Sequence, residues 1–342
     1  MARQQEAVMA AVMTAVKKSI AGAAASGRLS EAPALSPTIE PNHKELENLN
    51  DLRNELLIER LDLVSSLEDA KKANISNKEH IHRPELTWNY SIYINSRENI
   101  LEYLKPHHRL KEIGVVGCEG TLLPTWMGDS SLNNLVTVRI SKTYSCLNLP
   151  PLGQLTNLKH LFLEEMHGLK HLDCSFCGRN EIHFPKLEKL HLEKMSGLQE
   201  WLGDHHCALP SLRELTIKHR PALLQLIHEV PSPTKIWRSL VAISLLPSLT
   251  LSGLTRAGLP FEIGVIGLTK LEDQVIENCK QLKHLPFGLR NMNSLAHLEI
   301  LDCPGLSCNG FLSNLQFLSI NNCPELIQKL QDQDFDKISK YG

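Results

Sequence analysis

The 342-residue chain has little of what marks several common functional classes. Aromatic residues make up only 5% of it, and no stretch approaches the roughly 20 consecutive apolar residues that a membrane-spanning helix needs. Its 36 basic and 38 acidic side chains leave a formal net charge of -2, which gives no reason to expect nucleic acid or an anionic membrane as a partner. The chain also has no G-x-x-x-x-G-K-S/T phosphate loop and no G-x-S-x-G nucleophile elbow. We therefore expect neither an enzyme nor a nucleotide switch within this chain.

The nine cysteines are odd in number and scattered through the chain. Four of them follow the last apolar residue of a predicted strand by three positions, a place where a small side chain packs in a turn. We therefore expect reduced, structural cysteines and a reducing compartment rather than a disulfide framework. The four are Cys118, Cys279, Cys303 and Cys323.

A Cys-x-x-Cys pair at Cys174 and Cys177 has the inner spacing of a zinc knuckle or a redox pair. The run His205-His206-Cys207 could supply the second pair of ligands that a structural zinc site needs. Both stretches are expected in loops that join one strand to the next, and no thioredoxin-like strand-helix context surrounds the pair. We predict no catalytic residue, no cofactor and no metal, with a zinc or thiol enzyme as the alternative that metal analysis would reveal.

Leucines recur with a regular rhythm between Pro150 and Leu163, at Leu155, Leu158, Leu161 and Leu163. Side chains two apart in a strand point to one face, and a single unit cannot bury that face without copies on either side. Aligning the last apolar residue of each predicted strand finds the copies, at gaps of 25, 23, 29, 25, 34, 25, 24 and 20 residues. This period is that of leucine-rich repeats. The anchors are Val115, Ile140, Leu163, Leu192, Ile217, Leu251, Ile276, Ile300 and Ile320.

These repeats predict an α/β fold, a leucine-rich-repeat solenoid or horseshoe with a parallel concave β-sheet and an irregular or short helical convex side. We expect about ten repeats in residues 43–342, preceded by a disordered leader rich in Ala, Ser and Pro at 1–42. The 34-residue gap before Leu251 predicts an inserted loop or a decayed repeat, and Gln274 at a leucine position predicts local irregularity. The repeat domain would divide into an entry segment at 43–105, regular repeats at 106–217, an irregular insertion at 218–267, repeats at 268–330 and a short tail.

Within the entry segment, residues 46–61 predict a strand centred on Leu56-Leu57-Ile58. Residues 66–80 have capping residues, alanines and mixed charge, which predict a helix. A second strand is expected at 86–90 and a short helix at 98–104, ahead of Pro106.

An ordered series of motifs between about residues 44 and 340 resembles the repeat region of plant coiled-coil nucleotide-binding leucine-rich-repeat (NLR) disease-resistance proteins. The resemblance implies a protein-recognition module of plant innate immunity, which binds a pathogen effector or a guarded host protein and restrains a nucleotide-binding module. Because this chain has no phosphate loop, we expect a truncated relative that acts with such a module in trans, or a fragment of a longer gene. The motifs include Leu123-Pro124-Thr125-Trp126, Leu149-Pro150-Pro151-Leu152-Gly153-Gln154-Leu155, Phe184-Pro185-Lys186-Leu187 and the Cys-Pro-x-Leu turns at Cys303 and Cys323.

The alternative function is a leucine-rich-repeat substrate-recognition adaptor of a ubiquitin ligase. It would need an F-box-like helical segment, and residues 1–42 are too rich in Ala and Pro for one. Glycosylation sequons occur at Asn74 and Asn89 but nowhere in 100–342, which favours the cytoplasm. Residues 1–30 loosely resemble an organelle transit peptide, which is the alternative location.

The candidate site is the solvent-facing side of the predicted sheet. Residues beside the buried leucines point to solvent, and stacking places equivalent positions side by side as ladders. Phe162 is the most specific candidate among these residues, because an aromatic side chain flanked by charged residues suits a protein contact. The candidate face comprises Arg139, Lys142, His160, Phe162, Glu164, His191, Glu193, Lys218, His297, Glu299 and Phe317.

Overall fold

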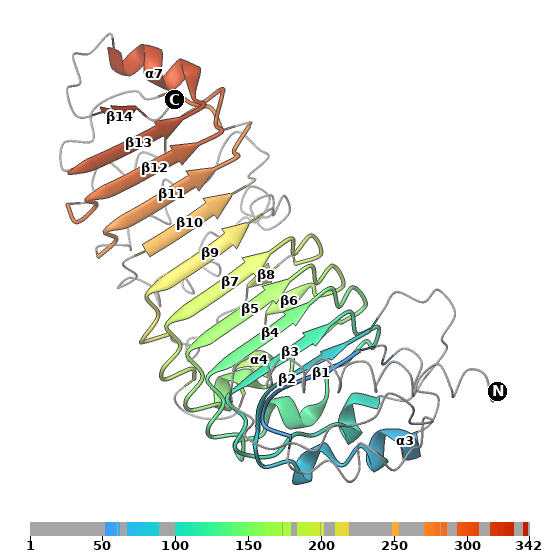
Figure 1. Cartoon of the computed structure of the whole chain (residues 1–342). Helices are drawn as coiled ribbons and strands as arrows, with labels where there is room; N and C mark the ends of the chain where they lie inside the picture. Colours follow the sequence, from blue (N-terminus) through green and yellow to red (C-terminus); the bar gives the residue numbers. More distant parts are fainter. Residues whose placement is uncertain are drawn as a thin grey trace, which may run out of the picture.

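The computed structural model describes residues 52–59, 61, 67–88, 100–172, 174–178, 183–198, 200–201, 209–218, 248–252, 270–280, 282–285, 293–307, 315–331 and 338–340. In them, one twelve-stranded sheet runs the length of a solenoid, with every strand parallel to its neighbours (Figure 1). The order is β1-β2-β3-β4-β5-β7-β9-β10-β11-β12-β13-β14, so each repeat adds one strand beside the last. The predicted leucine-rich-repeat solenoid is therefore confirmed. The strands are β1 (Asn54–Ile58), β2 (Ile81–Thr87), β3 (Glu112–Val116), β4 (Thr137–Ser141), β5 (His160–Glu164), β7 (Lys189–Glu193), β9 (Glu214–Lys218), β10 (Ser248–Ser252), β11 (Asp273–Glu277), β12 (His297–Leu301), β13 (Phe317–Asn321) and β14 (Ile338–Lys340).

The nine anchors predicted from the leucine rhythm form one line across the sheet. Each occupies the fourth place of a five-residue strand, and each pairs in register with the anchor of the next strand. A slip of one residue would turn every buried side chain of a strand to solvent, so the apolar pattern itself determines the register. The predicted alignment of repeats is confirmed.

Apolar side chains from positions two and four of the strands β3 to β9 and β11 to β13 form a continuous core with leucines of the approach turns. In β5, Leu161 and Leu163 are fully buried, and Leu155 and Leu158 lie beneath them with 1% exposure or less. Each fully buried aliphatic side chain contributes about 1.5–3 kcal/mol, which ordering entropy largely offsets. Stability therefore comes from stacking on neighbouring repeats rather than from any single one.

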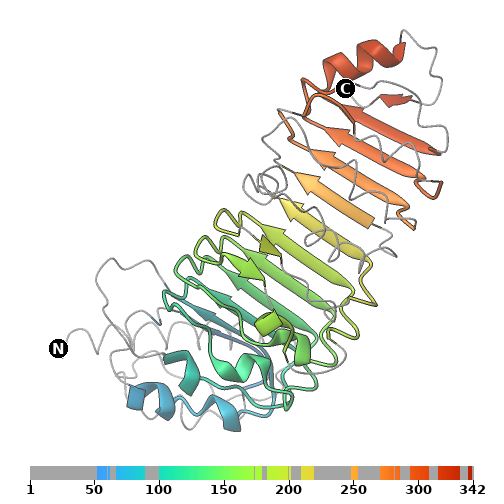
Figure 2. The ribbon, with the colours of Figure 1, turned by 180° about the vertical axis from the view of Figure 1, so that it is seen from behind.

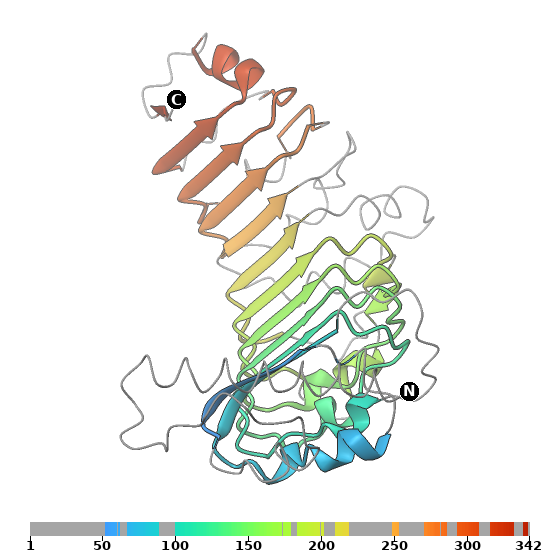
Figure 3. The ribbon, with the colours of Figure 1, turned by 45° about the vertical axis from the view of Figure 1, so that its right-hand side comes forward.

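Short helical pieces lie on the side of the solenoid away from the sheet, as the rotated views show (Figures 2 and 3). A separate two-stranded parallel sheet is formed there by β6 and β8. At the C-terminal end, α7 covers the last repeat and buries Leu326 and Leu330. These elements are α3 (Leu67–Lys72), η2 (Ile75–Asn77), η3 (Ile100–Tyr103), η4 (Thr125–Gly128), η5 (Leu152–Gln154), α4 (Cys174–Cys177), α7 (Pro324–Gln331), β6 (His171–Leu172) and β8 (Glu200–Trp201).

The entry segment differs from its prediction in detail. The strand centred on Leu57 is confirmed as β1, but the helix predicted at 66–80 ends at Lys72, because Asn74 takes a left-handed conformation with φ of 49°. The second strand covers Ile81–Thr87 rather than 86–90, since Ile81 already pairs with β1. The short helix predicted at 98–104 is a 3-10 turn over Ile100–Tyr103.

β10, which carries Leu251, lies within the predicted insertion at 218–267 and pairs in register with both β9 and β11, so the anchors Ile217 and Leu251 on either side of the long gap belong to adjacent strands. The other residues of the predicted insertion, and the leader at 1–42, lie outside the described residues, and the division into segments stays a prediction. The irregularity predicted at Gln274 is wrong for the backbone, because β11 keeps full register on both sides. Ladder hydrogen bonds involve only backbone groups, so the side chain of Gln274 does not disturb them.

The end of most strands turns through a left-handed residue. Gly117 follows β3 with φ of 78°, and Lys142, Glu165 and Lys194 follow β4, β5 and β7 with φ of 56°, 53° and 51°. The N–H of each donates to a carbonyl at the end of the next strand, for example Lys142 to Glu164. This turn leads the chain off the sheet, and it repeats at Asn278, Asp302 and Asn322.

Candidate protein-binding face

From β3 to β13, positions one, three and five of the strands point away from the core and form three rows across the sheet. Glu55 of β1 and Arg83 and Glu85 of β2 are exposed residues that continue this side of the sheet. We call the surface that these rows and residues form between β1 and β13 the concave face. Along β5 and β7 the burial alternates residue by residue, with the outward positions half-buried and the inward ones buried. The helical elements that the structure describes lie on the other side and leave this face uncovered (Figure 3).

Three side chains of the middle row stack across β4, β5 and β7. The guanidinium carbon of Arg139 lies 4.0 Å from the ring centroid of Phe162, which is the geometry of a cation-π contact. On the other side of Phe162, the ring centroid of His191 lies 5.8 Å away at an interplanar angle of 42°. The three are direct neighbours because Arg139 pairs with Phe162 and Phe162 with His191 in the sheet register. We call Arg139, Phe162 and His191 the aromatic stack.

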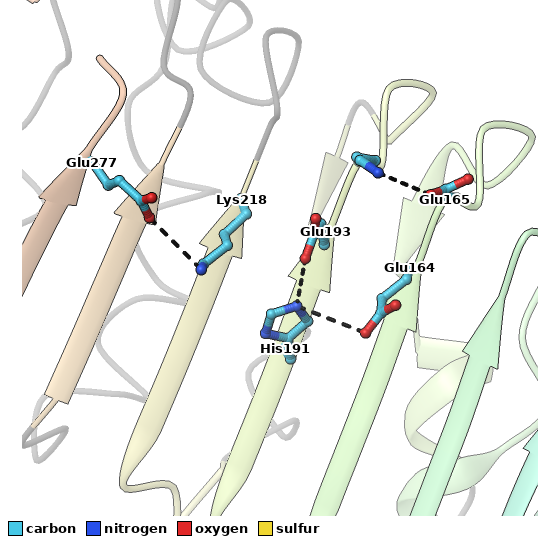
Figure 4. Close-up of polar contacts among 7 residues, drawn as sticks. Glu164, Glu165, His191, Glu193, Lys218 and Glu277 are labelled. Atoms are coloured by element: carbon cyan, nitrogen blue, oxygen red, sulfur yellow. Dashed lines mark hydrogen bonds and ion pairs between the residues drawn. The ribbon is translucent and has the colours of Figure 1, made fainter. Parts of the chain in front are cut away.

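Two carboxylates meet at the imidazole of the stack. Nε2 of His191 lies 3.1 Å from Glu193 Oε2 and 3.9 Å from Glu164 Oε1 (Figure 4). Glu164 and Glu193 are cross-strand partners, and like charges placed directly opposite each other in a sheet are destabilising. One imidazole nitrogen cannot donate fully to both carboxylates, and the two carboxylates together carry more negative charge than one imidazole can balance.

Three other cations of the concave face form ion pairs with carboxylates of nearby strands. Lys189 Nζ lies 2.7 Å from Glu214 Oε2, and Arg83 contacts carboxylates of both β1 and β3. Lys218 on β9 reaches past β10 to Glu277 on β11, with an Nζ–Oε2 distance of 3.7 Å (Figure 4). Since these side chains are exposed to solvent, each pair contributes only about 0–1 kcal/mol to stability.

A second cluster with the same composition lies near the C-terminal end. His297 Nδ1 lies 2.7 Å from Asp273 Oδ1, and the imidazole packs edge-on against Phe317 with ring centroids 6.2 Å apart. Phe317 is 41% exposed, which is unusual for a phenylalanine. Glu299 lies two residues after His297 on the same face of β12.

Ten of the eleven residues predicted for the site lie at outward positions of the sheet. The structure brings Arg139, Phe162 and His191 together with Glu164 and Glu193, and it places the group around His297 several strands away. Their role in binding stays a prediction. The ten are Arg139, His160, Phe162, Glu164, His191, Glu193, Lys218, His297, Glu299 and Phe317.

The placement of Lys142 on the sheet face is wrong. Lys142 is an exposed residue that follows the last residue of β4 and begins the left-handed turn, with φ of 56°, so it is not part of the strand. The prediction also missed Arg83, Glu112 and Asp273, which pair with other residues of the face. Arg83 was missed because the second strand was placed too late, whereas Glu112 and Asp273 stand one residue before a buried strand position and could have been found by the same alternation.

The turn cysteines form a ladder of thiols in the buried edge of the last repeats. The Sγ atoms of Cys279, Cys303 and Cys323 donate to backbone carbonyls two residues earlier, at 3.2–3.3 Å. The backbone N–H of Cys279 in turn donates to Sγ of Cys303, and that of Cys303 to Sγ of Cys323. Hydrogen bonding with the Cys279 thiol, together with burial, raises the pKa of Cys303 to about 11. Free, buried cysteines were correctly predicted at Cys118 and in this ladder.

Cys177 is an exception to the expectation of reduced cysteines, because it takes part in a disulfide. Within the described residues, no group of three or more His, Cys, Asp or Glu side chains is placed to hold a metal ion. His205, His206 and Cys207, the other half of the zinc hypothesis, lie outside the residues that the structure describes. Among the helices in the described ranges, none is long and apolar enough to cross a membrane.

A strand, a left-handed turn and a leucine-lined return loop, repeated in register along one parallel sheet, define a leucine-rich-repeat protein. Residues 43–166 match the family described as R13L1/DRL21 LRRs. RPP13-like protein 1 of Arabidopsis thaliana is 28% identical over 84% of this chain, and disease resistance protein RGA2 of Solanum bulbocastanum is 31% identical over 72% of it. The repeats are thus those of the leucine-rich-repeat region of plant NLR disease-resistance proteins. The chain spans 31% and 25% of the length of these two relatives.

An internalin (inlF) of Listeria monocytogenes is a more distant structural match. Its solved structure is 18% identical, with a TM-score of 0.37, and the match covers 85% of this chain and 78% of that chain. No statement about the present chain follows from a similarity at this level.

Proposed function

We propose that this chain is the protein-recognition module of a plant disease-resistance NLR-like protein in the defence response, and that it binds protein ligands through the concave face. The single observation that supports this most is the aromatic stack, an arginine, a phenylalanine and a histidine held in contact on an uncovered sheet face. Arg and aromatic side chains dominate the energetics of protein interfaces, since they bury a large area at low entropic cost. A second aromatic side chain, Phe317, stands exposed on the same face.

The ligand in this proposal is a pathogen effector or a guarded host protein, and a nucleotide-binding NLR module would associate in trans. The 342 residues contain no phosphate loop, so any nucleotide switch would belong to that partner module. The function takes place in the cytoplasm in this proposal, and no catalytic step is part of it.

The aromatic stack provides the test. The full chain is co-expressed in leaf tissue with the nucleotide-binding module of RGA2, and complex formation is measured by co-immunoprecipitation. A chain with Arg139→Glu and Phe162→Ala should lose at least about tenfold in recovered complex, because it loses two interface anchors. Lys280→Glu is the matched control, since it makes the same charge change at an exposed turn residue outside the sheet.

Equal recovery of the wild type and of the stack variant would rule out the concave face as the surface that binds this partner module, and would contradict the proposal that the chain recognises its protein partners through that face. A thermal-shift assay with ATP or ADP addresses the nucleotide part. The melting temperature of the chain alone should not change, and a clear nucleotide-dependent rise would contradict the proposal.

A further inference from the structure

The concave face has a larger excess of negative charge than the chain as a whole. Its described side chains include nine carboxylates and four Lys or Arg cations, a formal charge of nine negatives against four positives, whereas the whole chain has a net charge of -2. The acidic excess is thus concentrated on the surface proposed for binding. The carboxylates are Glu55, Glu85, Glu112, Glu164, Glu193, Glu214, Asp273, Glu277 and Glu299, and the cations are Arg83, Arg139, Lys189 and Lys218.

All four cations are already engaged within the face. Arg83, Lys189 and Lys218 form ion pairs, and Arg139 lies over the ring of Phe162. Among the described residues, five carboxylates consequently form no ion pair with a Lys or Arg of the face. These five are Glu85, Glu164, Glu193, Asp273 and Glu299. Lys194, just beyond β7, has its own ion pair with Glu165 but lies close enough to Glu164 and Glu193 for these carboxylates to help raise the pKa of its ammonium group.

Four of the five fall into two groups of the same make-up. In the first group, Glu164 and Glu193 flank His191, which packs on Phe162. In the second, described above, Asp273 and Glu299 accompany His297 and Phe317. Each group therefore offers an incoming cation two carboxylates beside an aromatic ring, although in the first group Arg139 already lies over one face of that ring.

The surface between the two groups is lined by small side chains. Thr216, Thr250 and Val275 form the middle row on β9, β10 and β11, and all three are half-buried small side chains. To one side of this row, Lys218 and Glu277 are paired with each other (Figure 4). A peptide backbone can lie over the small side chains without meeting a large one.

The distance between the groups matches an extended chain. His191 on β7 and His297 on β12 are four strand steps apart, about 19 Å at about 4.8 Å per step, and they are offset by two residues, about 7 Å, along the strand direction, which together give about 20 Å. An extended peptide rises about 3.3 Å per residue, so six residues cover about 20 Å. Side chains at i and i+6 point to the same side of such a peptide, because the side-chain period of an extended chain is two.

We infer that the concave face binds an extended basic segment of its protein partner, which crosses β7 to β12 and places Lys or Arg side chains at positions i and i+6 in the two acidic groups. This inference rests on the proposed function and specifies the partner of the same face. The cation in the first group reduces the repulsion between Glu164 and Glu193. The cation in the second group forms charge-assisted contacts with Asp273 and Glu299 beside His297.

Fluorescence anisotropy of labelled peptides with the full chain tests the spacing. One peptide carries two arginines six residues apart in a Gly/Ser background, and a second carries the same two arginines three residues apart. The first should bind at least about tenfold more tightly, and its affinity should fall with ionic strength. Equal affinity of the two peptides, or no binding of either, would overturn the inference, because both outcomes show that the spacing of the two groups is not recognised.

Paired variants locate the binding. Glu164→Gln with Glu193→Gln, and Asp273→Asn with Glu299→Gln, should each weaken the six-residue peptide about tenfold. Glu119→Gln with Glu325→Gln removes the same charge at exposed positions outside the sheet and should leave the affinity unchanged. If the stack variant no longer binds the nucleotide-binding module but the two peptides bind with equal affinity, the inference fails and the proposed function stands. If the stack variant retains the module, the proposed function fails as well.

Discussion

Gln274 on β11 and Leu298 on β12 occupy the same place in neighbouring repeats, side by side in the buried interior, and only Leu298 is apolar. Gln274 is 1% exposed, and within the described structure neither Nε2 nor Oε1 of its amide has a hydrogen-bond partner. Every other strand from β3 to β13 has an aliphatic residue at this place. The strand β11 thus keeps its register although it has a side-chain amide at a position where the other repeats have an aliphatic residue.

Substituting Gln274→Leu should raise the free energy of unfolding by about 1–3 kcal/mol, because an unpaired buried amide costs about that much. Urea denaturation followed by circular dichroism measures the change. The matched control is Leu298→Gln at the same register position, which should lower the free energy of unfolding by a similar amount or more. A loss of stability in Gln274→Leu would show that the amide makes a favourable contact.

The left-handed turn after β3 gives a second prediction. Gly117 has φ of 78°, and a Cβ there would lie 2.6 Å from the carbonyl oxygen of Trp88. Gly117→Ala should lower the free energy of unfolding by more than about 1 kcal/mol, since both the backbone conformation and the contact are unfavourable for alanine. Gly305→Ala is the control, because its Cβ would meet no atom closer than 3.7 Å. That substitution should leave the melting temperature unchanged or raise it slightly, and a comparable fall in both variants would contradict the argument.

The ion pair between Lys105 and Asp129 predicts a dependence of stability on pH. Its Nζ–Oδ2 distance is 2.7 Å, and this hydrogen bond lowers the pKa of Asp129 from 3.8 to about 2. A carboxylate with a lowered folded-state pKa stabilises the protein above its unfolded pKa, and this stabilisation is lost as the pH falls from about 4 towards 2. Solvent screening limits the effect to about 0.5–1 kcal/mol, since both side chains are more than a third exposed.

Lys105→Met should therefore lose stability near neutral pH and converge with the wild type as Asp129 becomes protonated. Thermal unfolding of both chains between pH 5 and pH 2 measures this. Lys280→Met, which removes an exposed lysine elsewhere, is the control. A constant difference between Lys105→Met and the wild type over the whole pH range would mean that packing, and not the charge of Asp129, is responsible.

The thiol ladder should be chemically inert in the folded protein. Cys303 is fully buried and its pKa is raised to about 11, so hardly any of it is thiolate at neutral pH. Iodoacetamide at about pH 8 should leave Cys279, Cys303 and Cys323 unmodified in the native state and modify all three in denaturant. Peptide mass spectrometry measures the modification. Rapid labelling of Cys303 without denaturant would show that the last repeats open readily.

The sequence alone determined the repeat and its register. Leucine and isoleucine at a fixed spacing predicted the fourth position of nine strands, because a one-residue slip would expose an entire buried face. The same alternation assigned ten of the eleven candidate residues to the solvent side of the sheet. It could not place Lys142, since the left-handed turn that removes this residue from the face depends on a hydrogen bond to the next repeat, at Glu164.

The tertiary structure alone decided which of the outward side chains act together. The contact of Phe162 with Arg139 and His191, and the pairing of Lys218 with a carboxylate two strands away, depend on the stacking of segments that are 23 to 59 residues apart in sequence. The sequence shows nearly equal numbers of acidic and basic side chains. In the described structure, however, stacking brings every Lys and Arg of the concave face into a contact within that face and leaves five of its carboxylates without an ion pair to these cations. Local pattern specifies which face of a strand is buried, whereas the charge that a surface offers depends on which strands become neighbours.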